Sequence, residues 1–180
     1  YGASQNAIST YQNAITIIDA GRVTPELLEL CKYIKYIVCS KGFAETVTGM
    51  KFDFNNPQSL VEIYNRLQNK YPNANIVITL EEHGCLYQNN NEIKIMPGLK
   101  AQAVDTTGAG DIFHGAFTYG LANGFDMEKT ITISNIAAGL SVTKIGARKA
   151  IPNLSEVLDY YAGKVNGNIQ NPANQNGNVQ

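Results

Sequence analysis

The glycine-rich stretch at residues 105–117 reads DTTGAGDIFHGAF and places Gly108 and Gly110 where a helix is predicted to begin. Glycines at such a position leave backbone N–H groups uncovered, and a helix N-terminus favours anions. Asp111 follows directly, so its carboxylate either caps the helix or acts on an anion held beside it. On the residues alone, an anion-binding helix start and a tightly packed, capped turn are equally good interpretations.

Two common phosphate-binding motifs do not fit this stretch. A Walker A loop requires Gly-Lys-Ser/Thr after the first glycines, and none follows. The third glycine of a dinucleotide-binding fingerprint would fall at position 113, which is Phe113. The chemistry of the stretch therefore has to be read from its surroundings.

Short β-prone runs alternate with amphipathic segments around this stretch. The expected strands are residues 14–19, 36–40 and 75–80, followed by a hairpin from 85–88 and 92–96. The expected helices are residues 24–34, about 44–48, 57–71, the segment after the glycines to about 123, 127–144, and one from 152–154 onward. This order predicts an α/β fold with a parallel sheet, helices on both faces, and ligands at the carboxyl ends of the strands. The loops to be found there are 19–22, 40–43, 80–84 and 105–111.

The composition is that of a globular protein. The chain has 180 residues, 44% of them hydrophobic, and a net charge of −1. We therefore expect no nucleic-acid or membrane-surface partner, and no apolar run approaches the ~20 residues that span a bilayer. The cysteines lack a metal-ligand spacing, which favours reduced thiols in a cytoplasmic protein; they are Cys31, Cys39 and Cys85.

The two ends of the chain differ in character. Residues 163–180 are rich in Asn, Gln and Gly and are predicted to form a disordered tail. The chain opens at Tyr1 without a methionine or a recognisable signal peptide, and runs straight into structured-looking sequence. We expect a fragment or a processed chain.

The stretch from Asp105 to Asp111, followed by Phe113, Gly115 and Ala116, closely resembles the second signature of the PfkB (ribokinase-like) carbohydrate kinases. Residues 79–87 (TLEEHGCLY) resemble the nucleotide loop of that family, and residues 135–152 (NIAAGLSVTKIGARKAIP) resemble its helix and following loop. The resemblance covers about residues 14–160. It implies that residues 1–162 form the C-terminal part of a ribokinase-like three-layer sandwich with a mainly parallel central sheet, and that the N-terminal part and its β lid are absent.

The resemblance implies ATP-dependent phosphorylation of a sugar hydroxyl. Asp111 would be the catalytic base at the substrate, and the amides of Gly108, Ala109 and Gly110 would form an anion hole over the transferring phosphoryl group. Phosphoryl transfer needs positioning and charge stabilisation, which preorganised N–H groups supply. The same positive potential should keep Asp111 ionised and able to accept a proton. Arg22, after the first strand, is placed to reach phosphate, although a solvated surface arginine is the more ordinary interpretation; the same applies to Lys41.

The nucleotide positions implied by the resemblance are Thr79, Glu81, Gly84, Asn135 and Ala138. Glu81 departs from the glycine that is usual there: its carboxylate would repel phosphates but accept hydrogen bonds from ribose hydroxyls. A solvated turn is the alternative for residues 79–84. Core packing of a small-residue helix face is the alternative for Ala137, Ala138 and Gly139.

The resemblance also implies metal ions. The positions that surround a monovalent cation in many relatives, K⁺ here, are Asp105, Thr107, Ser141, Lys144 and Gly146; Ala150, where some relatives offer a hydroxyl, counts against this site. Residues 40–43 (SKGF) replace an Asn-x-x-Glu that helps to organise Mg²⁺. We therefore expect Mg²⁺ to be held mainly by ATP phosphates and water. His83 and His114 are expected to be structural.

Two functions from different classes remain open. The first is an ATP-dependent sugar kinase, with a nucleoside kinase as a substrate-level alternative; intact Asp111 and its glycines favour it. The second is a noncatalytic nucleotide-binding remnant or interaction module, favoured by the missing front portion, by Ser40 and Phe43, and by Glu81. The expected partners are ATP and a small sugar, which would be a furanose or a ketose, with a homodimer in the full-length parent.

Overall fold

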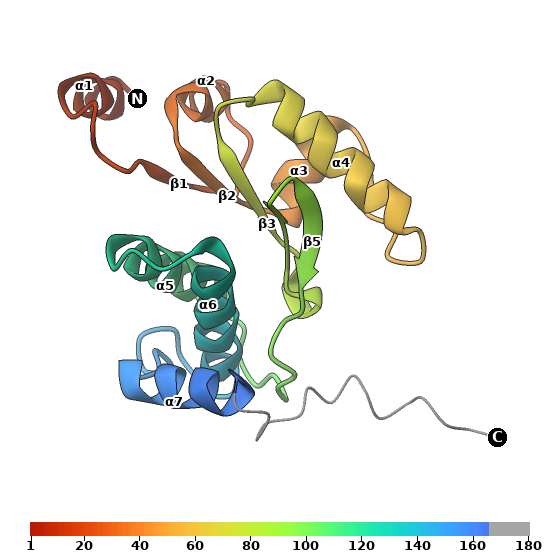
Figure 1. Cartoon of the computed structure of the whole chain (residues 1–180), viewed down its shortest axis with the longest axis vertical. Coiled ribbons are helices and arrows are strands. Elements are labelled where there is room, and N and C mark those ends of the chain that lie inside the picture. Colours follow the sequence, from red (N-terminus) through yellow and green to blue (C-terminus); the bar gives the residue numbers. More distant parts are fainter. Residues whose placement is uncertain (166–180) are drawn as a thin grey trace. The chain divides into compact units, whose positions relative to one another are not determined.

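A computed structural model of the chain describes residues 1–165, shown in Figure 1. These residues fall into two compact units, and the boundary between them in the sequence lies between Met96 and Pro97. We call residues 1–96 the sheet unit and the described residues from 97 on the helical unit. Of the predicted tail, residues 163–165 belong to a helix, and residues 166–180 lie outside the described part of the chain.

The sheet unit contains a five-stranded sheet in the order β1-β2-β3-β4-β5. The strands are β1 (Ile17–Ala20), β2 (Tyr36–Ser40), β3 (Asn75–Thr79), β4 (Cys85–Asn89) and β5 (Glu92–Met96). The first three run parallel, and β4 and β5 add the antiparallel hairpin that the sequence predicts. The helical elements are α1 (Gly2–Thr10), α2 (Pro25–Leu30), the 3₁₀ helix η1 (Cys31–Tyr33), α3 (Lys41–Thr48), α4 (Pro57–Lys70) and the 3₁₀ helix η2 (Glu81–His83).

The core of the sheet unit follows from strand register. Ile37 pairs with Ile18 and Ile76, so apolar side chains form a row across the sheet on one face. The helices α2, α3 and α4 contribute apolar residues to the same cluster, among them Leu27, Phe43, Ile63 and Leu67. Each fully buried side chain of this kind contributes about 1.5–3 kcal/mol. This burial holds the strands in their register, and it thereby positions the loops that follow β1, β2 and β3.

Helix starts and stops in the sheet unit follow local rules. The Thr24 hydroxyl accepts a hydrogen bond from the Leu27 amide at 3.2 Å, and Pro25 occupies the first helical position, as predicted. The α3 helix begins at Lys41, earlier than the predicted 44, because Ser40 caps it by accepting from the Phe43 amide at 3.1 Å. The helix stops at Gly49, whose φ of 70° is left-handed. The α1 helix was not predicted, since none of its residues is buried and no apolar period marks it.

The helical unit consists of α5 (Ala109–Ala122), α6 (Met127–Ser141) and α7 (Leu154–Val165). The close packing predicted for α6 is confirmed. A Cβ at Gly120 of α5 would lie 2.8 Å from Thr130 of α6, and one at Gly139 would collide with the Leu99 side chain. Within residues 1–165 no helix is long and apolar enough to cross a membrane.

Candidate active site

The turn before α5 requires a glycine at position 108. Gly108 is the N-cap residue and has a φ of 78°, a left-handed conformation that disfavours other residues. A Cβ there would also lie 2.9 Å from the Ala147 Cβ. The absence of a side chain at Gly108 therefore makes room for Ala147 to pack against the start of α5. Sequence reasoning gave Ala147 no such role.

Two of the backbone amides at the start of α5 donate no hydrogen bond within the described residues. The Ile112 amide makes the first helical hydrogen bond, to the Gly108 carbonyl at 2.9 Å, and the Ala109 amide reaches the Thr106 carbonyl at 3.2 Å. The amides of Gly110 and Asp111 have no acceptor among residues 1–165, and a Cβ at Gly110 would meet nothing within 4 Å. Free N–H groups, open space and the positive end of a helix together form a surface that favours an anion.

Asp111 does not cap this helix. No side chain makes a capping hydrogen bond to the start of α5, and within the described residues the Asp111 carboxylate has no hydrogen-bond or ion-pair partner. It is exposed in the first turn. Of the two interpretations left open by the sequence, the uncommitted carboxylate beside free amides is the one that the geometry supports.

Asp105 organises the turn that leads to α5. One carboxylate oxygen accepts from the Thr107 amide at 2.9 Å and the other from the Gly146 amide at 2.8 Å. Hydrogen bonds from the Thr107 side chain, the Gly146 amide and the Thr107 amide hold the pKa of Asp105 below its ordinary value. The amides of Val104 and Asp105 both donate to the Val142 carbonyl, at 2.7 and 3.2 Å. The glycine turn is thus fastened to the loop after α6.

Asp105, Thr107 and Gly146, three of the five positions predicted for a monovalent cation, meet in this network. Ser141 and Lys144 lie beside it, where the Lys144 amide donates to the Ser141 carbonyl at 3.2 Å. The Gly146 carbonyl accepts from the Ala150 amide at 2.8 Å. Across residues 1–165 no group of three or more His, Cys, Asp or Glu side chains is arranged to hold a metal. A cation here would depend on backbone carbonyl oxygens.

Two polar residues of α5 and α6 have structural partners. Asn135 is buried on α6 and donates to the Pro97 carbonyl at 3.3 Å, while Ala138, one turn on, is half-buried. His114 donates from Nδ1 to the Gly110 carbonyl at 3.1 Å, one turn back on its own helix. The His114 bond supports the structural role expected for that residue.

The remaining predicted residues lie in the sheet unit, after parallel strands. Arg22 is exposed in the loop that follows β1 and forms no ion pair within the described chain. The Thr79 hydroxyl, at the end of β3, donates to the Cys39 carbonyl at 3.3 Å. The Ser40 hydroxyl, besides capping α3, donates to the Gly21 carbonyl at 3.4 Å. The loops after β1, β2 and β3 therefore lie together at the carboxyl ends of these parallel strands, as predicted.

The loop after β3 adopts a constrained conformation. Gly84 has φ 89° and ψ −123°, which only glycine adopts readily, and Glu81 has a left-handed φ of 58°. The Glu81 carboxylate pairs with the Lys41 ammonium at 2.7 Å, a contact that raises the pKa of Lys41. The sequence did not predict this pair. His83 stacks on Phe54 with ring centroids 3.8 Å apart, so its ring also has a packing role.

Comparison with known proteins shows which family the chain resembles over most of its length. Residues 5–154 match the family model described as pfkB family carbohydrate kinase. Ribokinase of Haemophilus influenzae is 33% identical over 132 residues, which are 73% of this chain and 42% of that protein. The chain thus spans less than half the length of this relative.

Solved structures agree with the family match. A putative ribokinase from Agrobacterium tumefaciens is 26% identical, with a TM-score of 0.78 over 88% of this chain and 51% of that one. Arabidopsis thaliana ribokinase complexed with ribose and ATP has the same fold, with 24% identity and a TM-score of 0.71 over 87% of this chain and 50% of that one. The predicted ribokinase-like α/β fold is confirmed.

Proposed function

Since the chain belongs to the PfkB family of carbohydrate kinases, we propose that it supplies the nucleotide-binding and catalytic-base portion of an enzyme that transfers a phosphoryl group from ATP to a sugar hydroxyl. The observation that carries this proposal is the uncommitted Asp111 carboxylate beside the free amides of Gly110 and Asp111 itself. In a capping aspartate, a carboxylate oxygen would accept a hydrogen bond from one of those amides. Here both groups are available to a substrate and to a phosphate.

We assign the proton transfer to Asp111. Its carboxylate accepts the proton of the attacking sugar hydroxyl, and the resulting oxygen attacks the terminal phosphorus of ATP. The bond from that phosphorus to the bridging oxygen breaks, and ADP leaves with the electron pair. The amides at the start of α5, those of Gly110 and Asp111 foremost, donate hydrogen bonds to the phosphoryl oxygens as negative charge develops on them. Gly108 sets the left-handed turn that directs these amides outward, and the Asp105 bonds to Thr107 and Gly146 keep that turn in place.

The loops of the sheet unit are assigned to the nucleotide. Thr79, Glu81 and Gly84 follow β3, and Lys41 offers a positive charge at the same edge. Glu81 suits the ribose hydroxyls better than the phosphates, because its charge repels the latter. Asn135 and Ala138 of α6 complete the proposed set, and Arg22 is proposed to contact phosphate. ATP would bring Mg²⁺ held by its own phosphates and by water, and K⁺ would bind carbonyl oxygens of the 141–146 loop.

For the substrate we propose a furanose or ketose sugar. Relatives named ribokinase and a neighbour complexed with ribose and ATP support ribose as the first sugar to try. A noncatalytic nucleotide-binding module is the second candidate. It is favoured by the Lys41–Glu81 pair, which places a carboxylate where phosphates would approach, and by the use of Ser40 as a helix cap.

The test is ATP consumption by the 180-residue chain over a panel of pentoses, hexoses, ketoses and nucleosides. The matched variants are Asp111→Asn and Asp159→Asn, the latter an exposed carboxylate of α7. Loss of a general base lowers kcat by about 10²–10⁴-fold, so Asp111→Asn should lose sugar phosphorylation while Asp159→Asn keeps it. Equal phosphorylation by both variants would refute the assignment. Nucleotide binding without turnover of any compound would favour the noncatalytic module.

A further inference from the structure

The peptide group between Gly110 and Asp111 has one bonded end and one free end. Its N–H, the Asp111 amide, donates no hydrogen bond within residues 1–165 and is one of the two amides assigned to the phosphoryl group. Its C=O, on Gly110, accepts a hydrogen bond from Nδ1 of His114 at 3.1 Å. Because a carbonyl oxygen only accepts, Nδ1 carries the proton in this contact. His114 therefore bonds to the opposite end of the peptide group whose N–H is assigned to phosphate.

The Gly110 carbonyl accepts twice from the same residue. In an α-helix it also accepts from the backbone amide four residues on, which is the amide of His114 itself. The His114 ring is half-buried and lies edge-on to the buried Phe113 ring, with centroids 6.3 Å apart. Packing thus limits the directions in which the ring can turn, and its Nδ1 stays over the carbonyl.

A hydrogen bond to a carbonyl has two effects on the N–H of the same peptide group. It polarises the group, and each bond in such a chain strengthens the next by about 10–30%. It also restrains the plane of the peptide group, which matters beside Gly110 because glycine has the most permissive backbone. Since the bond from an amide to an anion is charge-assisted, a gain of this size changes affinity by up to about fourfold.

We propose that His114 is a positioning residue for phosphoryl transfer: through the Gly110 carbonyl it orients the Asp111 amide and strengthens the hydrogen bond of that amide to the phosphoryl oxygens. This role rests on the proposed function. His114 does not touch the sugar or the nucleotide in it, and the Asp111 carboxylate remains the proton acceptor. The hydrogen bond that makes His114 structural within α5 is thus also the one that prepares an amide for the reaction.

The test compares His114→Thr with His114→Val, two variants that differ only by a hydroxyl in place of a methyl group. A helical threonine in this chain can donate to the carbonyl four residues back, as the Thr132 hydroxyl does to the Glu128 carbonyl at 2.7 Å. His114→Thr therefore keeps a side-chain donor on the Gly110 carbonyl, and His114→Val removes it. The matched control is Thr118→Val, which makes the same exchange one turn further along α5 at an exposed position.

The readout is the backbone amide signal of Asp111 in ¹H–¹⁵N NMR spectra of the chain, first alone and then titrated with inorganic phosphate. Without phosphate, the signal should lie closer to its unmodified position in His114→Thr than in His114→Val. Phosphate should bind about two- to fourfold more weakly to His114→Val than to His114→Thr. The Thr variant and the Thr118→Val control should bind like the unmodified chain.

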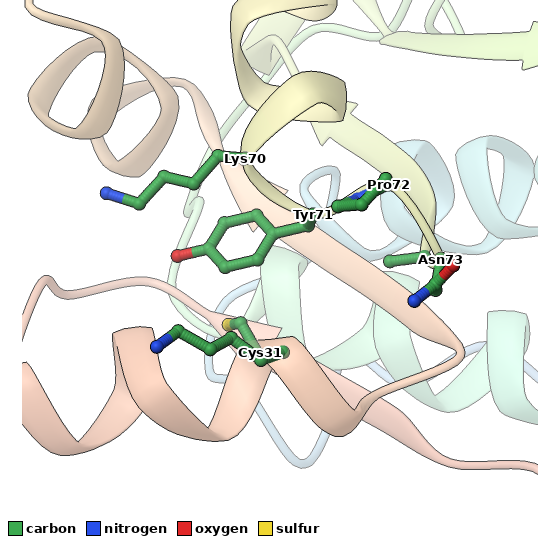
Figure 2. Close-up of a pocket in the computed structure, with 7 residues that line it drawn as sticks. Cys31, Lys70, Tyr71, Pro72 and Asn73 are labelled. Atoms are coloured by element: carbon green, nitrogen blue, oxygen red, sulfur yellow. The ribbon is translucent and has the colours of Figure 1, made fainter.

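A second control, Lys70→Gln, shows whether the Asp111 signal reports local binding or only the net charge of the chain. Lys70 is an exposed lysine of the sheet unit, and Figure 2 shows it beside Tyr71 at the end of α4. Removing its charge should leave the titration unchanged.

Three results would overturn the role of His114. Equal phosphate affinity in the Thr and Val variants would show that the donor has no effect, and phosphate binding by the unmodified chain would then leave the proposed function intact. Equal weakening in both variants would show that the ring acts by packing on Phe113 and not as a donor. An Asp111 signal that does not respond to phosphate in the unmodified chain would overturn the proposed function, and the role of His114 with it.

Discussion

The Asp105 carboxylate accepts a hydrogen bond from the Gly146 amide at 2.8 Å, joining residues that are 41 positions apart in the chain. This bond ties the turn before α5 to the loop after α6. The same carboxylate also accepts from the Thr107 amide inside the turn. A single acidic side chain therefore sets the position of the amides to which we assign phosphoryl binding.

Asp105→Asn should lower both stability and its dependence on pH. The folded state holds the pKa of Asp105 below its unfolded value of about 3.9. The stabilisation is therefore present above that pH and is lost as pH falls through the folded pKa. Melting temperatures measured between about pH 2 and 6 should fall less steeply with acid in Asp105→Asn than in the unmodified chain. An unchanged slope would show that these hydrogen bonds contribute nothing.

Gly108→Ala should destabilise the chain by roughly 1–3 kcal/mol, because alanine is strained at a φ of 78° and its Cβ would lie 2.9 Å from that of Ala147. Gly115→Ala is the matched control. Gly115 lies inside α5 with nothing within 4 Å of a Cβ, so alanine there should stabilise by up to about 1 kcal/mol. Urea unfolding of both variants is the measurement. Similar effects at the two positions would contradict the description of the turn.

Glu81→Gly should tighten ADP binding while leaving stability nearly unchanged. Glycine relieves a left-handed residue, a gain of about 1 kcal/mol. The lost pair with Lys41, mostly exposed on the Glu81 side, offsets about 0–1 kcal/mol of it. Lys41 would then be free to attract phosphate. Titration calorimetry with ADP and with adenosine distinguishes the alternatives: weaker binding of both ligands would indicate that the carboxylate contacts the ribose instead.

Gly139→Ala should cost about 1–3 kcal/mol, because the added Cβ collides with the Leu99 side chain where α6 meets the segment before the glycine turn. Leu99→Ala shortens that side chain and should also destabilise when made alone. The double variant should then be more stable than the sum of the two changes predicts, since the contact no longer forms. The measurement is thermal unfolding of the unmodified chain, the two single variants and the double variant. If the changes in unfolding free energy were strictly additive, the two residues would not be in contact.

Elements with local signals were predictable from the sequence. The strand at residues 36–40 was predictable because Tyr36, Ile37 and Val38 all favour extended backbone, and Thr24 with Pro25 marked the start of α2. Gly49 and Gly124 marked helix ends because both adopt left-handed φ. Features that depend on distant residues were not predictable. The Glu81–Lys41 pair joins residues 40 positions apart, and the buried Tyr71 hydroxyl, which has no hydrogen-bond partner within residues 1–165, owes its burial to the tertiary fold.

The position of β1 at the end of the strand order has a practical consequence for handling the protein. Along its outer side, no strand within residues 1–165 hydrogen-bonds to Ile17–Ala20. Open strand edges recruit extended polypeptide, including further copies of the same molecule. Samples of this chain should therefore aggregate more readily as they are concentrated, and covering that edge with an added strand should improve solubility.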